Sequence, residues 1–188
     1  MTLETDEADE LSALQKRKRT EWLASRWLLH ELFGVENARR PCFKDEHGKP
    51  YVTEPEQHIS LSHSLDWVAA VVSKKKVGID IQSITTKLVR IAPKFMRSDE
   101  LQCWADNEQQ LEHLHVFWGA KECLYKAYGL RGLDFRAHIS VQVFDYHSSG
   151  GQTVGRVRIN SFTADYAIFY QKIDYFLLVY AIEQPSFL

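Results

Sequence analysis

The spacing of apolar residues predicts a chain that starts with a helix and continues into strands. Between Glu10 and Phe33, large apolar residues recur at helical intervals, and Gly34 follows as a stop signal. The runs 58–62 and 67–73 have the composition of strands. We expect residues 1–9 to be a solvated acidic lead-in and residues 35–56, with three prolines, to be a loop with little regular structure.

The second half repeats this order of helix before strands. Residues 84–106 predict a helix broken near Pro93, and a longer helix runs from Glu108 to Tyr128 and ends at Gly129. Four strands follow, at 139–146, 153–160, 166–171 and 175–182. Helices and strands do not alternate strictly, so an α+β fold is favoured over a doubly wound parallel sheet. We expect two similar α+β halves, residues 1–83 and 84–188.

The segment V-G-I-D-I-Q (77–82) predicts a strand with one chemically active face. Side chains alternate along a strand, so Gly78, Asp80 and Gln82 share a face that the apolar residues leave free. An aspartate among isoleucines is costly unless it is paired, hydrogen-bonded or bound to a metal. A glycine beside it suits close approach by a ligand, although Asp80 as a strand-end carboxylate bonded to backbone remains an alternative.

The segment F-W-G-A-K-E-C-L-Y-K (117–126) predicts a helix on which Trp118, Glu122 and Lys126 form one stripe. Glu122 and Lys126 form either an ordinary surface ion pair or half of a site. If the stripe meets the face that carries Asp80, two carboxylates and an ammonium group converge. Such a group is able to hold a divalent cation and the phosphates bound to it.

Further candidates lie outside these two segments. His63 follows short hydroxyl residues in S-L-S-H-S, which suits a phosphate-binding turn or a histidine that caps its own turn. Arg19 and Arg26 are seven residues apart and share a helix face, either as phosphate clamps or as solvated surface. Lys49 lies in the loop segment G-K-P.

Composition and charge restrict the partners and the compartment. The 188 residues include 23 basic and 25 acidic side chains, which argues against a general nucleic-acid binder. Three cysteines without a C-x-x-C pair predict free thiols in a reducing compartment. The acidic N-terminus resembles no secretory signal, and no apolar run is long enough to span a membrane. We therefore expect a cytoplasmic protein.

Taken together and in this order, the motifs resemble one family, the 4′-phosphopantetheinyl transferases of the surfactin-synthetase and enterobactin-synthetase-component type. The resemblance extends over most of residues 19–129 and runs through six segments: R-T-E-W-L-A-S-R (19–26), H-G-K-P-Y (47–51), H-I-S-L-S-H-S (58–64), V-G-I-D-I-Q (77–82), K-F-M-R-S-D-E (94–100) and F-W-G-A-K-E-C-L-Y-K-A-Y-G (117–129). It implies a pseudo-dimer of two α+β halves that acts as a monomer. It also implies transfer of the phosphopantetheine arm of coenzyme A to a serine of an acyl or peptidyl carrier protein.

The resemblance assigns roles by motif. Asp80, Glu122 and the residue at position 82 would bind magnesium, Glu122 would also be the base for the carrier serine, and Lys126 would stabilise the phosphate under attack. The groups that would bind coenzyme A, together with Lys126, are Arg19, Arg26, Lys49, Ser62 and His63. The family usually has glutamate where this chain has Gln82, so either the affinity for magnesium falls or Glu100 or water completes the metal shell. Two alternatives are a weak or inactive relative that only binds coenzyme A or a carrier, and an unrelated metal-dependent phosphohydrolase.

Overall fold

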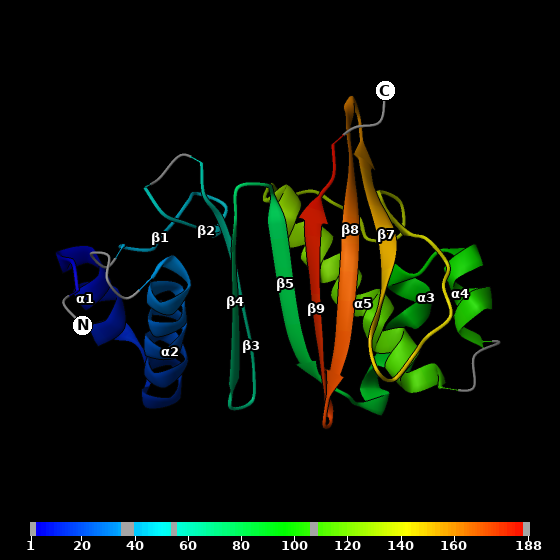
Figure 1. The fold of residues 1–188 in the computed structure, drawn as a ribbon, viewed down its shortest axis with the longest axis horizontal. Helices are drawn as coiled ribbons and strands as arrows, with labels where there is room; N and C mark the ends of the chain where they lie inside the picture. Colours follow the sequence, from blue (N-terminus) through cyan, green and yellow to red (C-terminus); the bar gives the residue numbers. More distant parts are fainter. Residues whose placement is uncertain (1–2, 35–39, 54–55, 106–108, 186–188) are drawn as a thin grey trace.

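The chain folds as a helix-and-hairpin unit set beside a larger unit in which a helix covers a five-stranded sheet (Figure 1). The computed structural model describes residues 3–34, 40–53, 56–105 and 109–185. The elements of the first unit are α1 (Thr5–Ala13), α2 (Lys16–Phe33), β1 (Phe43–Lys44), β2 (Pro50–Tyr51), β3 (His58–Ser64) and β4 (Trp67–Ser73). Those of the second are β5 (Val77–Ser83), the 3-10 helix η1 (Thr86–Ile91), α3 (Ala92–Phe95), α4 (Ser98–Ala105), α5 (Gln110–Tyr128), β6 (Ile139–Val141), β7 (Gly151–Ile159), β8 (Phe162–Ile173) and β9 (Phe176–Glu183).

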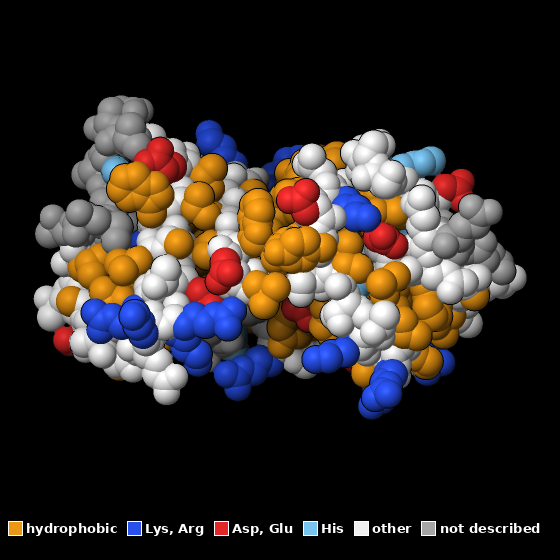
Figure 2. Space-filling view, turned by 90° about the horizontal axis from the view of Figure 1, so that it is seen from below, with side chains coloured by type: hydrophobic (Ala, Val, Ile, Leu, Met, Phe, Trp, Pro, Cys, Tyr) orange, Lys and Arg blue, Asp and Glu red, His pale blue; other side chains and the backbone are white. Residues whose placement is uncertain are grey.

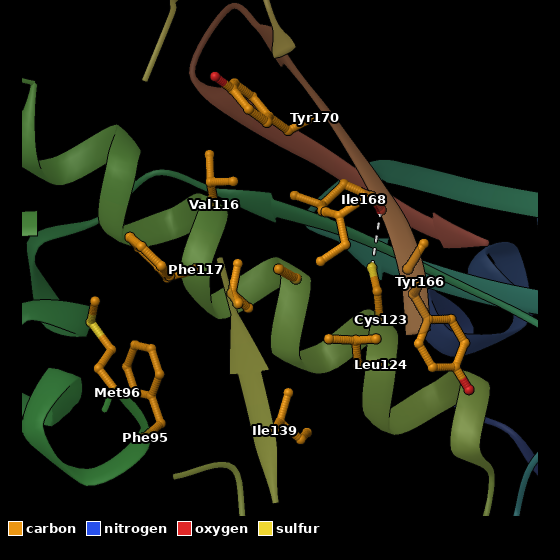
Figure 3. Close-up of a cluster of buried hydrophobic side chains, with 14 of the residues drawn as sticks. Phe95, Met96, Val116, Phe117, Cys123, Leu124, Ile139, Tyr166, Ile168 and Tyr170 are labelled. Carbon is orange, nitrogen blue, oxygen red and sulfur yellow. Dashed lines mark hydrogen bonds between the residues drawn. The ribbon is translucent and has the colours of Figure 1, made fainter. Parts of the chain in front are cut away.

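The larger sheet has the strand order β5-β9-β8-β7-β6, and all its pairs are antiparallel. Helix α5 crosses one face of this sheet, and the main core lies between them (Figure 3). Phe117 and Leu124 of α5 are fully buried there against Tyr166 and Ile168 of β8. In the same layer the Cys123 thiol donates to the Val179 carbonyl at 3.2 Å, and burial raises its pKa. The three cysteines are free thiols, as expected.

The smaller unit has its own core between α2 and the β3–β4 hairpin. Leu29 of α2 is buried with Cys42, Val52 and Ile59. Strands β3 and β4 form a separate two-stranded sheet, so each unit places one long helix against a sheet of its own. The predicted α+β class is confirmed.

Serine hydroxyls join the two units. The backbone N–H groups of Ile79, Ile81 and Ser83 donate to the side-chain oxygens of three β3 residues at 3.1, 3.1 and 3.2 Å: Ser60, Ser62 and Ser64 respectively. The residue numbers of the donors on β5 and of the acceptors on β3 increase together, so the two strands run parallel. The division at residue 83 stays a prediction, since β5 ends there but pairs with β9 of the larger sheet.

Most predicted elements are present. Strands over 58–62, 67–73 and 77–82 are confirmed, and the long helix ends at Gly129, whose φ of 78° is left-handed. The broken helix after residue 84 is confirmed as η1, α3 and α4, although position 106 and the predicted start of the long helix at Glu108 lie outside the described residues. The strand over 139–146 is shorter than predicted, because only Ile139–Val141 pair with β7.

The acidic N-terminal segment is mostly exposed over its described residues 3–9, as predicted, but it is helical and one of its side chains is buried. Residues Thr5–Ala13 form α1, separate from α2, with a capping box between Glu4 and Glu7. Glu7 is buried, with 2% of its surface exposed, because it faces the buried Arg26 of α2 (3.9 Å) and accepts from the Cys42 N–H at 3.2 Å. A buried cation needs a counter-charge, and that requirement folds the acidic segment onto α2. Within the described residues, no helix has the length and apolar character needed to cross a membrane.

One histidine of α5 is buried against aromatic side chains of the main core. His113 is completely buried, and its ring contacts those of Phe117 and Phe144 at centroid distances of 4.9 and 4.7 Å. Burial lowers its pKa from 6.5 to about 4, against a weaker opposing effect of the Asp145 charge. The folded protein therefore holds this imidazole neutral in the pH range where an exposed histidine is protonated.

This histidine should make the folded state less stable in acid. Between pH 6.5 and about 4 the unfolded chain takes up a proton that the folded chain refuses, so the free energy of unfolding falls as the pH falls. Between pH 7 and pH 5 we expect a loss of about 2 kcal/mol from this residue. Urea denaturation of the wild type and of His113→Phe at both pH values measures it. Equal losses in the two proteins would contradict the assignment, because the carboxylates titrate alike in both.

Candidate active site

The face of β5 that carries Gly78, Asp80 and Gln82 packs against α5, as the alternation predicts. Ile79 and Ile81 point the other way, into a cluster with Phe176. The expectation that Gly78 leaves room for a ligand is wrong. A Cβ atom at this position would lie 1.9 Å from the Cys123 backbone oxygen, so the glycine admits the backbone of α5. The close contact holds Asp80 against the last turns of that helix.

Lys126 bridges the two units at this point. Its ammonium group donates to the Ile79 carbonyl at 2.8 Å, to Asp80 Oδ1 at 3.0 Å and to the Ser62 hydroxyl at 3.3 Å. An ammonium group has three hydrogens, so all its donors have partners. Asp80 is buried, and the lysine side chain keeps 27% of its surface exposed. A phosphate oxygen that reaches Lys126 must replace one of these three acceptors.

The Ser62 hydroxyl is equally committed. It donates to Asp80 Oδ1 at 3.1 Å and accepts from the Ile81 N–H and from Lys126. One hydrogen and two lone pairs are all that a hydroxyl offers. The alternating serines of S-L-S-H-S, which we interpreted as a phosphate-binding turn, thus make bonds to β5 in this structure. These serines are two residues apart in the sequence. That spacing is the sequence signal of the row of hydrogen bonds between β3 and β5, which we call the seam.

Glu122 is the second carboxylate beside the network. It is half-buried on α5, one turn before Lys126. Burial raises the pKa of Glu122; the Lys126 charge opposes the rise and the nearby charge of Asp80 adds to it. Two carboxylates close enough to repel each other, with one shared ammonium group, form a site that a cation stabilises.

Gln82 lies on the predicted face. Its amide oxygen, which a metal ligand would direct toward the cation beside Asp80, points to a histidine instead. Its nitrogen donates to Asp80 Oδ2 and to the His115 carbonyl, both at 3.1 Å. Its oxygen lies 2.6 Å from His115 Nδ1. Gln82 therefore presents a donor to Asp80 and directs its oxygen to a histidine. His115 is a residue that the sequence reasoning missed, because nothing in the helical pattern distinguishes it from a core position.

Glu100 and Lys121 have structural partners elsewhere. The two side chains are fully buried and form an ion pair at 2.8 Å. Glu100 also accepts from the Arg97 and Val141 N–H groups, so its oxygens are in use and it does not complete a metal shell at Asp80. In the described part of the chain, no group of three or more His, Cys, Asp or Glu side chains is arranged to hold a metal ion.

Two adjoining clefts open beside the Lys126 network. A cleft of about 230 Å³ is lined in part by Lys49 and Lys126, and one of about 520 Å³ by Ser62 and His63. They share three wall residues: Gly48, Pro50 and Leu61. The ammonium group of Lys49 donates to the Ala127 carbonyl of α5 at 3.0 Å, and burial lowers its pKa. The exposed His63 ring lies 3.6 Å from Glu21.

The two arginines of α2 differ in their surroundings. Arg26 lines the larger cleft but is buried, with its guanidinium over the Trp22 ring and facing Glu7 and Glu10. It also donates to the Cys42 carbonyl. Arg19 is exposed and is not among the residues that line either cleft. The structure thus gathers Ser62, Asp80, Gln82, Glu122 and Lys126, places Lys49, His63 and Arg26 along the clefts, and leaves Arg19 outside them.

Comparisons with known proteins show the family to which the chain belongs. The family model of the 4′-phosphopantetheinyl transferase superfamily matches residues 76–175. The chain is 32% identical to a 4′-phosphopantetheinyl transferase of Bacillus pumilus over 113 residues (58% of this chain, 48% of the relative). It is 34% identical to one of Aneurinibacillus migulanus over 110 residues (57% and 46%). The chain thus spans about half the length of these relatives. Among solved structures, the holo-[acyl-carrier-protein] synthase of Thermotoga maritima matches with a TM-score of 0.47 and 17% identity, over 59% of this chain and 64% of that one.

The same substitution at the two lysines of α5 should destabilise the protein to different extents. Lys121→Met leaves the Glu100 carboxylate buried without a counter-charge, and we expect it to lower the free energy of unfolding by about 3–5 kcal/mol. Lys126→Met should cost clearly less, because this lysine is partly exposed and Asp80 keeps the donors of Ser62 and Gln82. Urea denaturation at neutral pH compares them. A loss of about 1 kcal/mol or less for Lys121→Met would show that Lys121 is not a structural ion-pair partner.

Proposed function

Because the chain belongs to the 4′-phosphopantetheinyl transferase superfamily, we propose that it transfers the 4′-phosphopantetheine arm of coenzyme A to a serine of an acyl or peptidyl carrier protein and releases adenosine 3′,5′-bisphosphate. The observation that carries the proposal is the network of Lys126, Asp80 and Ser62 beside Glu122, at the junction of two clefts. Such chemistry requires positioning and charge neutralisation more than covalent catalysis.

The donor set at the junction fits magnesium. Mg²⁺ prefers oxygen ligands, keeps several waters and is bound in such enzymes by one or two carboxylates and the substrate phosphates. Asp80 and Glu122 supply two carboxylates, and we propose that both bind the ion. When bound, the ion would neutralise negative charge on the pyrophosphate of coenzyme A.

The side chains divide the remaining work. Glu122 accepts the proton of the carrier serine, a role that its raised pKa supports. The serine oxygen then bonds to the phosphorus that carries the pantetheine arm, and the bond from that phosphorus to the adenosine bisphosphate oxygen breaks. Lys126 exchanges one of its present acceptors for a phosphate oxygen and offsets the charge that develops there.

The clefts provide a path for coenzyme A. Lys49 and His63 lie on its walls, and Arg26 adds positive charge from within the wall. We propose that these groups and Ser62 bind the phosphates and the adenosine end. Arg19 is assigned to the same end from the motif alone, and its exposed position on α2 requires the ligand to extend beyond the clefts.

The carrier protein is proposed to bind at the face of the molecule shown in Figure 2. Hydrophobic side chains gather over the middle of this face, with lysine and arginine side chains along one edge (Figure 2). The turn between β8 and β9 lies on this side of the molecule (Figure 1). In that turn Tyr175 is 63% exposed, and its carbonyl accepts from the Ile84 N–H just before η1. The exposed Lys87 and Arg90 of η1 suit a carrier that is acidic around its serine.

The other expectations complete the proposal. A monomer is proposed, because both units that build the junction belong to one chain. Carrier protein and coenzyme A are the proposed partners, as the family implies, and no membrane partner is proposed. Nearly balanced charge argues against a nucleic-acid partner. Free cysteines support a reducing compartment, and we propose the cytoplasm.

Intact-mass spectrometry tests the activity. The protein is incubated with an apo carrier, coenzyme A and Mg²⁺, and the carrier should gain the mass of one phosphopantetheine arm. Glu122→Gln should lower the rate at least ~100-fold, because it removes the base and a metal ligand. A control on the same helix is Glu112→Gln, which alters a surface pair with Lys172 and should keep the wild-type rate.

The outcomes separate the alternatives. No mass shift with several carriers, together with measurable coenzyme A binding, would identify a relative that binds without transferring. Phosphate release without carrier modification would point to a phosphohydrolase. A wild-type rate for Glu122→Gln would remove Glu122 from the roles of base and ligand.

A further inference from the structure

We infer that Gln82 and His115 are a positioning pair: His115 holds the Gln82 amide, and the amide holds Asp80 for the cation without Gln82 becoming a ligand. The inference rests on the proposed function, because it requires a metal ion on Asp80. It assigns roles to a residue that the motif places in the metal shell and to a histidine outside the motif.

The orientation of the Gln82 amide is determined by its neighbours. Its nitrogen lies between two groups that only accept hydrogen bonds, the Asp80 carboxylate and the His115 carbonyl. Turning the amide over would place an oxygen against both acceptors and break two hydrogen bonds. The oxygen is therefore committed to His115 Nδ1 at 2.6 Å.

The contacts of the histidine favour the matching tautomer. His115 Nε2 lies 2.9 Å from the Thr85 nitrogen, whose N–H donates to it, and 3.1 Å from the Thr85 carbonyl oxygen. The shorter contact and the Gln82 oxygen beside Nδ1 place the ring proton on Nδ1, which donates it to the Gln82 oxygen. The residue is 2% exposed, so its ring nitrogens depend on these protein partners. A continuous chain of donors thus runs from Thr85 through His115 and Gln82 to Asp80.

Packing confines the same amide. A Cβ atom at Gly119 of α5 would lie 2.8 Å from Gln82 Nε2 and 2.7 Å from Val179 Cγ2. The helix therefore approaches the strand closely enough to leave the amide little freedom. The constraint comes from a glycine that precedes Glu122 by less than one helical turn.

The chain of donors determines which lone pair of Asp80 remains for a cation. An ionised carboxylate has about four lone-pair sites. Ser62 and Lys126 use Oδ1, and Gln82 uses one site on Oδ2. A cation is left with the remaining side of Oδ2, in an orientation that His115 maintains through Gln82. Hydrogen-bond partners of metal ligands commonly tune affinity in this way.

Manganese binding to the full chain tests the pair. Mn²⁺ replaces Mg²⁺ as an oxygen-ligated probe, and electron paramagnetic resonance measures its dissociation constant, without and with coenzyme A. Gln82→Met and His115→Phe should each weaken binding by about tenfold. Their combination should be no weaker than either alone, because both break the same chain. His115→Asn, which retains a donor near Gln82, should bind Mn²⁺ within a few-fold of the wild type.

Controls separate positioning from folding. His113→Phe makes the same change at a buried histidine of α5 that faces the aromatic cluster, and it should leave Mn²⁺ binding unchanged. Thermal unfolding confirms that each variant is folded; if His115→Phe is not, Gln82→Met and His115→Asn decide. Weaker binding in Gln82→Met with unchanged binding in His115→Phe would make Gln82 a ligand and overturn the inference. So would additive losses, or no Mn²⁺ binding by the wild type at millimolar concentrations with coenzyme A.

The transfer assay on the same proteins keeps the two proposals apart. A chain that shows the Mn²⁺ coupling but modifies no carrier contradicts the proposed function and supports the positioning pair. A chain that modifies its carrier while the Mn²⁺ constants show no coupling overturns the positioning pair alone.

Discussion

The structure depends on hydrogen bonds between the free edge of β5 and three serine hydroxyls of β3. The opposite edge of β5 pairs with β9, so the N–H groups of alternate residues need acceptors elsewhere. Hydroxyl groups satisfy them, and β3 stays outside the larger sheet while running beside it. The middle serine, Ser62, also bonds to Asp80 and Lys126. The seam that joins the two units and the candidate site therefore share the same atoms.

The distribution of charge on α5 follows from its rotation. Lys121 and Lys126 are five residues apart, about 140° around a helix, and so they face different surroundings. Lys121 lies in the core, where only the ion pair with Glu100 and two backbone carbonyls make its charge tolerable. Lys126 lies at the seam, where it keeps partial access to solvent and a cleft. One lysine is paired in the core, and the other lies at the seam beside the candidate site.

The amide at position 82 changes the charge of the site. Asp80 and Glu122 bring two negative charges against one from Lys126, whereas a glutamate at position 82 would bring a third. An amide donates to Asp80, which a carboxylate cannot do, and it links that residue to His115. The absence of a third carboxylate thus comes with a hydrogen bond that orients the first.

Local patterns in the sequence were enough to predict the α+β class, most strands, the end of α5 at Gly129, and the shared face of Asp80 and Gln82. Helical and strand periodicities are properties of neighbouring residues, so they are readable without the fold. Contacts between distant segments were decided only by the tertiary structure. The backbone of Cys123 fills the space beside Gly78, Glu7 folds back onto Arg26, and His115 reaches Gln82 from 33 residues away. Burial and pairing of polar groups depend on which segments meet, and the sequence by itself does not contain that information in a local form.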